Sequence, residues 1–260
     1  MYQENIKGYK ANAFQIKLFM ASLMVLDHLP HIPGLVPPLW EGIFHVMTRC
    51  VGAWFAFNAV EGFLHTRNKT RYNIRLFVWA VFMEVGNKVL EFLLKSRDIH
   101  INNNIFLTLA IGVLVLNIMT RPIRVFDKQE TKAIKFLRII LGTLVFLIGF
   151  VFSEGGIIII PFMLITYLFR NSTKKRNMAY IVTTVLLAAF YLNGAFIYDS
   201  LRTNIEMILF NSDWFFISVL PFLYLYNGQR GKNSKFTKYF FYVFYPAHLW
   251  IIAIISYFLK

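Results

Sequence analysis

Long apolar stretches follow one another along almost the whole chain, with short polar connections between them. Each can be judged against the roughly 20 residues that a helix needs to cross a bilayer. The candidate spans are 14–30, 40–64, 74–94, 103–120, 137–153, 155–170, 177–196, 213–227 and 238–259. A soluble domain of 260 residues would not carry 57% hydrophobic residues in such runs. We therefore predict an all-α, polytopic membrane bundle of about nine transmembrane helices.

Basic residues fall on alternate connections between these spans. Most of the 27 Lys and Arg lie in the segments 7–17, 67–75, 121–138, 170–176 and 230–238. Cytoplasmic loops carry an excess of such residues, so we expect the N-terminus inside and the C-terminus outside. The formal charge of +14 thus belongs to loops beside the lipid bilayer, and we expect no nucleic-acid partner.

One integral domain covering residues 1–260 is expected, because no linker, repeat or low-complexity tract divides the chain. The first apolar run ends in a polar Asp-His pair rather than a small-residue cleavage site, which indicates a retained helix. The single cysteine, Cys50, lies inside an apolar stretch and is expected to pack as a small buried hydrophobe.

Several ionisable residues interrupt the apolar stretches and are the first candidates for a functional site. They are Asp27, His28, His45, Arg49, Glu84, Lys88 and His248. A charged group at membrane depth costs at least about 2.5 kcal/mol on insertion scales, so it usually faces protein or water. We therefore expect a polar interior in the bundle, and look for the function there.

Lys17 and His28 share one face of the first predicted helix. Eleven residues at 100° each bring them within about 20° of alignment and roughly 16 Å apart, with Ala21 and Met24 between them. A snorkelling lysine and a helix-end histidine would explain this pattern. So would a track for a long ligand with an anionic head and a reactive tip. Asp27 points about 100° away from His28, which favours pairing with another helix.

The second and last predicted helices carry the remaining candidates. Glu41, His45 and Arg49 recur at every fourth residue and form a polar stripe, either a structural ladder or part of a site. In the last helix, His248 follows Pro246, which leaves a carbonyl one turn earlier without its helical donor. A histidine at that place is either a packed core residue or a functional one.

Several segments resemble the TraX family of bacterial membrane proteins, which is named for the F-pilin acetylase. The matching segments are Lys17 through Asp27-His28, Arg49 through Glu61-Gly62-Phe63, His65-Thr66-Arg67-Asn68 with Tyr72 and Arg75, Tyr226 through Gly231, and Phe241 through Leu249. More distantly, this family resembles transmembrane acyltransferases, which carry an Arg-x10-His pattern in their first helix. Here the spacing is kept as Lys17-x10-His28, with Lys in place of Arg, a weaker bidentate partner for phosphate.

The resemblance implies transfer of an acetyl group from cytoplasmic acetyl-CoA, with no metal. His28 is the expected base, or a transient carrier of the acetyl group. The catalytic group that we predict comprises His28, Asp27, His248, Arg49 and His45. Residues that we expect to bind the coenzyme are Lys17, Arg71, Arg75, Arg230 and Lys238.

The acceptor is left open by these residues: a pilin or other peptide N-terminus, a glycan and a small amine all fit. Two other functions also fit a membrane protein with intramembrane charges. One is a small transporter or flippase, and the other is a non-catalytic assembly factor for pilus or conjugation machinery. We expect a multi-pass location in the bacterial cytoplasmic membrane.

Overall fold

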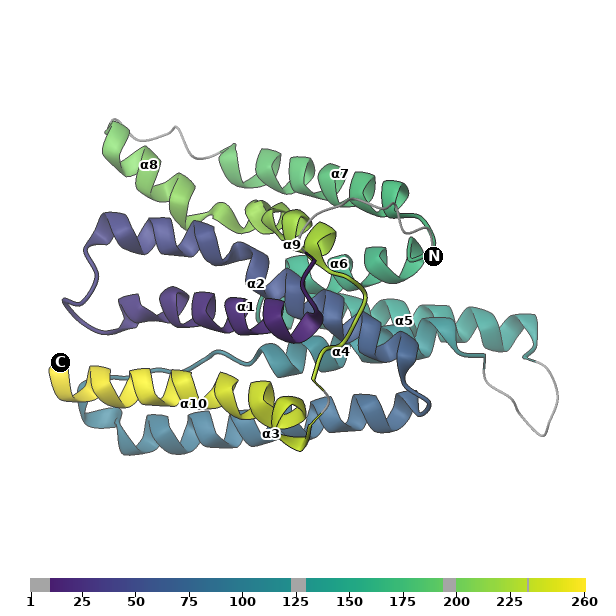
Figure 1. Cartoon of the computed structure of the whole chain (residues 1–260), viewed down its shortest axis with the longest axis horizontal. Helices are drawn as coiled ribbons and strands as arrows, with labels where there is room; N and C mark the ends of the chain where they lie inside the picture. Colours follow the sequence, from purple (N-terminus) through teal and green to yellow (C-terminus); the bar gives the residue numbers. More distant parts are fainter. Residues whose placement is uncertain (1–9, 123–129, 194–199, 233) are drawn as a thin grey trace. The chain divides into compact units, whose positions relative to one another are not determined.

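Helices make up all the regular structure in residues 10–122, 130–193, 200–232 and 234–260, the residues that the computed structural model describes (Figure 1). The α-helices are α1 (Ala13–His28), α2 (Pro38–His65), α3 (Lys69–Leu93), α4 (Ile105–Thr120), α5 (Lys132–Phe152), α6 (Gly156–Leu168), α7 (Thr173–Leu192), α8 (Leu201–Phe210), α9 (Leu220–Leu225) and α10 (Lys235–Leu259). Three 3₁₀ helices join them: η1 (Leu29–His31), η2 (Lys95–Arg97) and η3 (Ser212–Val219). The predicted all-α fold is confirmed.

Polar side chains define where many of these helices begin. Asn12, Asn104, Thr131, Ser172 and Ser234 each accept a hydrogen bond from a backbone N–H in the first turn of the helix that follows. Such caps satisfy donors that have no partner within the helix.

Three helices of the described residues are long and apolar enough to cross a membrane: α2, α5 and the Tyr239–Leu259 part of α10. The α8 helix and the segment Ser212–Leu225 reach the same standard together, but are bent by 49°. The predicted span 213–227 is therefore one part of a broken pair rather than a straight helix. The chain is a membrane protein, while nine crossings and their orientation stay predictions.

Two compact units divide the chain. The first unit comprises Met1–Phe55, Gly86–Asn102 and Asn171–Lys260, and the second comprises Ala56–Val85 and Asn103–Arg170. Our prediction of one integral domain stays a prediction.

The core of the first unit is built from large side chains that are almost fully buried. Met20, Trp54, Tyr180 and Val219 are each 0% exposed. Trp54 packs edge-on against the ring of Tyr226, with centroids 5.7 Å apart. Burying an aromatic residue of this size is among the largest single contributions to a core, so these contacts hold the elements around the site described below.

The second unit packs α4, α5 and α6 closely because small residues lie at their contacts. A side chain at Gly149 would have its Cβ 2.5 Å from side-chain atoms of both Ile111 and Ile160, so any larger residue would force these isoleucines to shift. Val113 and Met163 are 0% exposed at the same packing. Close approach through small residues is the usual way in which membrane helices gain contact.

Candidate functional site

Helices α1 and α10 lie side by side in the first unit and run in the same direction (Figure 1). Near their beginnings the rings of Phe14 and Phe241 are 6.0 Å apart, edge to face. Further along, the rings of His28 and His248 are 5.4 Å apart. The two helices therefore bring together two histidines from opposite ends of the chain, at the end of α1.

His28 is 8% exposed, and its Nδ1 atom is buried without a hydrogen-bond partner. Its ring also lies 5.3 Å from that of His31, in η1. A buried polar atom without a partner costs about 1–3 kcal/mol, so it calls for an explanation such as a ligand or a reacting group. The predicted base therefore has a ring nitrogen that the protein leaves unused.

His248 is 7% exposed, and its two ring nitrogens differ in their surroundings. Nδ1 lies 3.0 Å from the carbonyl oxygen of Phe244, whereas Nε2 is buried without a partner. A carbonyl can only accept, so Nδ1 must carry the proton in this contact. In the neutral ring Nε2 then keeps its lone pair, which is the form that can take up a proton.

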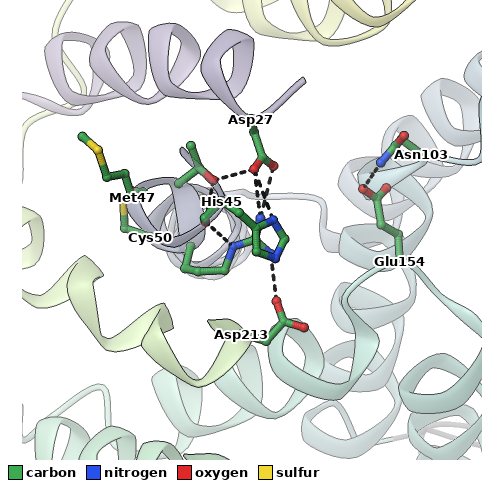
Figure 2. A network of polar contacts seen from close by, with 9 residues as sticks. Asp27, His45, Met47, Cys50, Asn103, Glu154 and Asp213 are labelled. Carbon is green, nitrogen blue, oxygen red and sulfur yellow. Dashed lines mark hydrogen bonds and ion pairs between the residues drawn. The ribbon is translucent and has the colours of Figure 1, made fainter. Parts of the chain in front are cut away.

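Next to His28, a cluster of charged and polar residues joins α1, α2 and η3 (Figure 2). The Nη2 atom of Arg49 contacts both carboxylate oxygens of Asp27, at 3.1 and 3.2 Å, and its Nη1 donates to Asp213 at 2.8 Å. Thr48 donates to Asp27 at 2.6 Å. Nδ1 of His45 lies 3.7 Å from the same carboxylate. The expected pairing of Asp27 with another helix is confirmed.

Every nitrogen of the Arg49 guanidinium is engaged within this cluster, because Nε also donates to the backbone oxygen of His45 at 2.8 Å. Charge-assisted contacts of this kind are stronger than neutral ones and fix geometry. Their effect is to hold the last turn of α1, and with it the backbone of His28. Asp213 was missed by our sequence analysis, since an aspartate after a helix break gives no periodic signal.

At the opposite end of α1, the loop that precedes α10 forms backbone hydrogen bonds with the residues at the start of α1. The Ala11 N–H donates to Leu225, the Asn227 N–H donates to Ala11, and the Ala13 N–H donates to Gln229, each at 2.9 or 3.0 Å. Gly231 closes the loop with a φ of +82°, a conformation that glycine adopts most easily. The segment 226–231, quoted above for its resemblance, thus lies against α1.

Two cations meet at this end, and neither pairs with a carboxylate among the described residues. Lys17 is half-buried, its Nζ lies 5.8 Å from the ring centroid of Phe241, and Arg230 is close enough for the two charges to interact. In the part of the chain that the structure describes, no carboxylate pairs with either of them. Repulsion between such neighbours is relieved when an anion binds.

The other residues predicted to bind the coenzyme are not seen to lie together with Lys17 and Arg230. Arg71 is exposed, and Arg75 has its guanidinium 5.3 Å from the ring centroid of Tyr72; all three residues belong to the second unit. The side chain of Lys238 lies outside the described part of the chain. A shared site for these residues and Lys17 stays a prediction.

A second polar cluster, in the second unit, holds the beginning of α4. Glu154 accepts from the backbone N–H of Asn104 and, at 2.9 Å, from the side chain of Asn103 (Figure 2). Asn104 Nδ2 donates to the Ala80 oxygen at 3.0 Å and to Glu84 at 3.2 Å. This cluster stabilises a helix start.

Within the described residues, no group of three or more His, Cys, Asp or Glu is arranged to hold a metal ion.

Comparison with known proteins gives two findings. A family model described as TraX protein matches residues 13–256. The chain is also 26% identical over 266 residues to a protein of Dichelobacter nodosus named "Probable fimbrial assembly protein FimC, serogroup H1". The aligned region covers 96% of this chain and 97% of the relative. No solved structure matches the chain significantly.

Proposed function

The chain belongs to the TraX family, and from this premise we propose that it is an integral membrane acetyltransferase. It moves an acetyl group from cytoplasmic acetyl-CoA to an amine or hydroxyl acceptor. One observation carries the proposal. Within the described residues, ring nitrogens of His28 and His248 without a hydrogen-bond partner lie at one end of α1, and two cations without a carboxylate partner lie at the other. A ligand with an anionic head and a distant reactive group fits this arrangement.

Lys17 and Arg230 bind the phosphates of the donor in this proposal. Their charges have no carboxylate partner among the described residues, and phosphate is the anion that such pairs of cations recognise. Along α1, eleven residues at 1.5 Å each separate Lys17 from His28 by roughly 16 Å. Acetyl-CoA supplies a polyphosphate head, a long pantetheine arm and a thioester that can be attacked.

His28 is the proposed general base. It takes the proton from the acceptor nitrogen or oxygen as that atom forms a bond to the thioester carbonyl carbon. The carbon–sulfur bond then breaks, and the proton passes to the departing sulfur. Nε2 of His248 can accept or relay this proton, because Nδ1 is held by the Phe244 carbonyl. Losing a general base typically lowers a rate by about 10²- to 10⁴-fold.

Asp27 and Arg49 act as positioning residues in this scheme. Their contacts fix the end of α1, and a catalytic group must be held within a fraction of an ångström to be effective. His45 supports the same carboxylate from 3.7 Å, and its ring stacks on that of Phe210 with centroids 6.2 Å apart.

The proposed topology has nine crossings, with the N-terminus inside and the C-terminus outside. The common direction of α1 and α10 supports it, because two spans that point the same way are separated by an odd number of other spans. Seven predicted spans lie between them. The basic end of α1 would then face the cytoplasm, where acetyl-CoA is found.

The biological setting that we propose is pilus assembly or conjugation, in the bacterial cell membrane. The name of the Dichelobacter nodosus relative, which refers to fimbrial assembly, supports this setting. A pilin or other peptide N-terminus is then the first acceptor to test, with a glycan or small amine as alternatives. A transporter and a non-catalytic assembly factor remain the competing functions, and neither requires acetyl-CoA to bind.

Mass spectrometry of acetylated species, in cells with and without the gene, tests the proposed function. A species lost on deletion should return with the wild-type chain but not with His28→Gln. Glutamine keeps the ability to form hydrogen bonds, but its side chain cannot take up a proton near neutral pH. Equal membrane abundance of the two proteins excludes a folding defect. If no acetylated species is lost, or if His28→Gln restores it fully, the proposal is wrong.

A further inference from the structure

A pocket of about 550 Å³ lies in the second unit, between the end of α4 and the beginning of α5. Its polar part includes Arg121 and Arg138, and its apolar part includes Ile134, Leu137 and Leu141. The proposed acetyl transfer uses none of these residues. The pocket therefore requires a separate account.

Arg138 has no free charge to offer a ligand. Its side chain is 7% exposed and pairs with the Glu130 carboxylate at 2.7 and 3.2 Å. Its Nη1 donates to the carbonyl oxygens of Ile118 and Met119, at 2.8 and 2.5 Å. These are orphan acceptors at the end of α4, where the helix dipole is negative. Arg138 thus neutralises the negative end of α4, which would otherwise repel an anion in this pocket.

Arg121 provides the positive charge. Its Nη1 donates to the hydroxyl of Thr70 at 3.1 Å, and it lies 3.5 Å from the side-chain oxygen of Asn117, both of them neutral. Among the described residues, no carboxylate forms an ion pair with it. An exposed guanidinium that lines a pocket and is held by neutral partners is well placed to receive a phosphate.

The apolar wall belongs to a helix that faces lipid. Only 17% of the most apolar 18-residue stretch of α5 is buried within the protein. Leu137 and Leu141 are 63% and 53% exposed. In a membrane helix such residues contact acyl chains. The pocket therefore combines a cation that pairs with no described carboxylate and an apolar surface that continues into the bilayer.

We propose that this pocket binds an anionic phospholipid, with its headgroup phosphate on Arg121 and an acyl chain along Leu137 and Leu141. Basic pockets between membrane helices are a known way of recognising such headgroups. The connection between α4 and α5 is also rich in Lys and Arg, which places the site beside the leaflet with the anionic surface. This inference does not depend on the acetyltransferase proposal.

Native mass spectrometry of the purified full chain, titrated with phosphatidylglycerol or phosphatidylcholine, tests the inference. The wild-type protein should bind phosphatidylglycerol more tightly. Arg121→Gln should weaken that binding about fivefold, the effect of one cation at a membrane surface, and leave phosphatidylcholine binding unchanged. Leu141→Trp should weaken the binding of both lipids by filling the pocket, while Arg202→Gln, at an exposed site far along the chain, should change neither.

Three results would overturn the proposal. The first is equal affinity of the wild-type chain for the two lipids. The second is a preference for phosphatidylglycerol that Arg121→Gln leaves intact. The third is full competition by inorganic phosphate, which would assign the site to a free anion rather than a lipid.

Discussion

His28 and His248 meet at the end of α1, and two different sequence patterns predicted them. His28 was predicted from its spacing to Lys17, and His248 from its place after a helix proline. Neither pattern could predict that their rings lie 5.4 Å apart, because that distance depends on how α1 and α10 pack. The tautomer of His248 follows from a single contact with the Phe244 carbonyl, which only the structure supplies.

If Nε2 of His248 takes part in proton transfer, replacing this residue should slow catalysis without weakening donor binding. His248→Gln should lower the acetylation rate by about 10²- to 10⁴-fold, the usual contribution of a group that transfers a proton. Single-turnover assays on protein saturated with acetyl-CoA would measure this change. A variant with wild-type rate would leave His248 only a packing role.

Arg49 is surrounded by partners that its loss would leave without a counter-charge. Arg49→Met should therefore lower stability by about 3 kcal/mol, because Asp27 and Asp213 would stay partly buried without their cation. Thermal unfolding in detergent would measure the effect. Arg202→Met is the matched control: its pair with Glu206 is exposed, and such pairs contribute less than about 1 kcal/mol. Equal losses for both variants would contradict the positioning role.

At the scale of elements, hydrophobic runs predicted most helices well, and failed where an apolar segment is not a regular helix. Residues 40–64 and 238–259 correspond closely to α2 and α10. Residues 213–227 have the composition of a span, yet they form η3 and α9 after a bend. Apolar composition reports the environment of a segment rather than its backbone geometry, so the break that positions Asp213 had no signal in the sequence.

The common direction of α1 and α10 can be tested by cross-linking. In a Cys50→Ser background, cysteines at Phe14 and Phe241 should be joined by a short bifunctional thiol reagent, since their rings are 6.0 Å apart. Cysteines at Phe14 and Ile255 should not be joined, because residue 255 lies near the far end of α10. Mass spectrometry of linked peptides gives the result. The reverse pattern would mean that the helices are antiparallel.

At the scale of the whole molecule, the alternation of basic connections predicts which loops face the cytoplasm. Single cysteines at Lys174 and Lys232 should resist an impermeant thiol reagent in intact cells, while one at Arg202 should react. Permeabilised cells provide the control that all three positions are reachable. External labelling at 174 and 232 would invert or refute the topology, and with it the cytoplasmic position of the Lys17 end.

The central claim is that α1 carries an acetyl-CoA site with its phosphate end at Lys17 and Arg230. Equilibrium binding of radiolabelled acetyl-CoA to the purified protein tests it most directly. We expect saturable binding that Lys17→Ala and Arg230→Ala each weaken about tenfold or more, because a hydrogen bond to a charged group contributes about 1.5–3 kcal/mol. His28→Gln and Arg202→Ala should bind like the wild type. Absence of saturable binding, or equal damage from Arg202→Ala, would contradict the account.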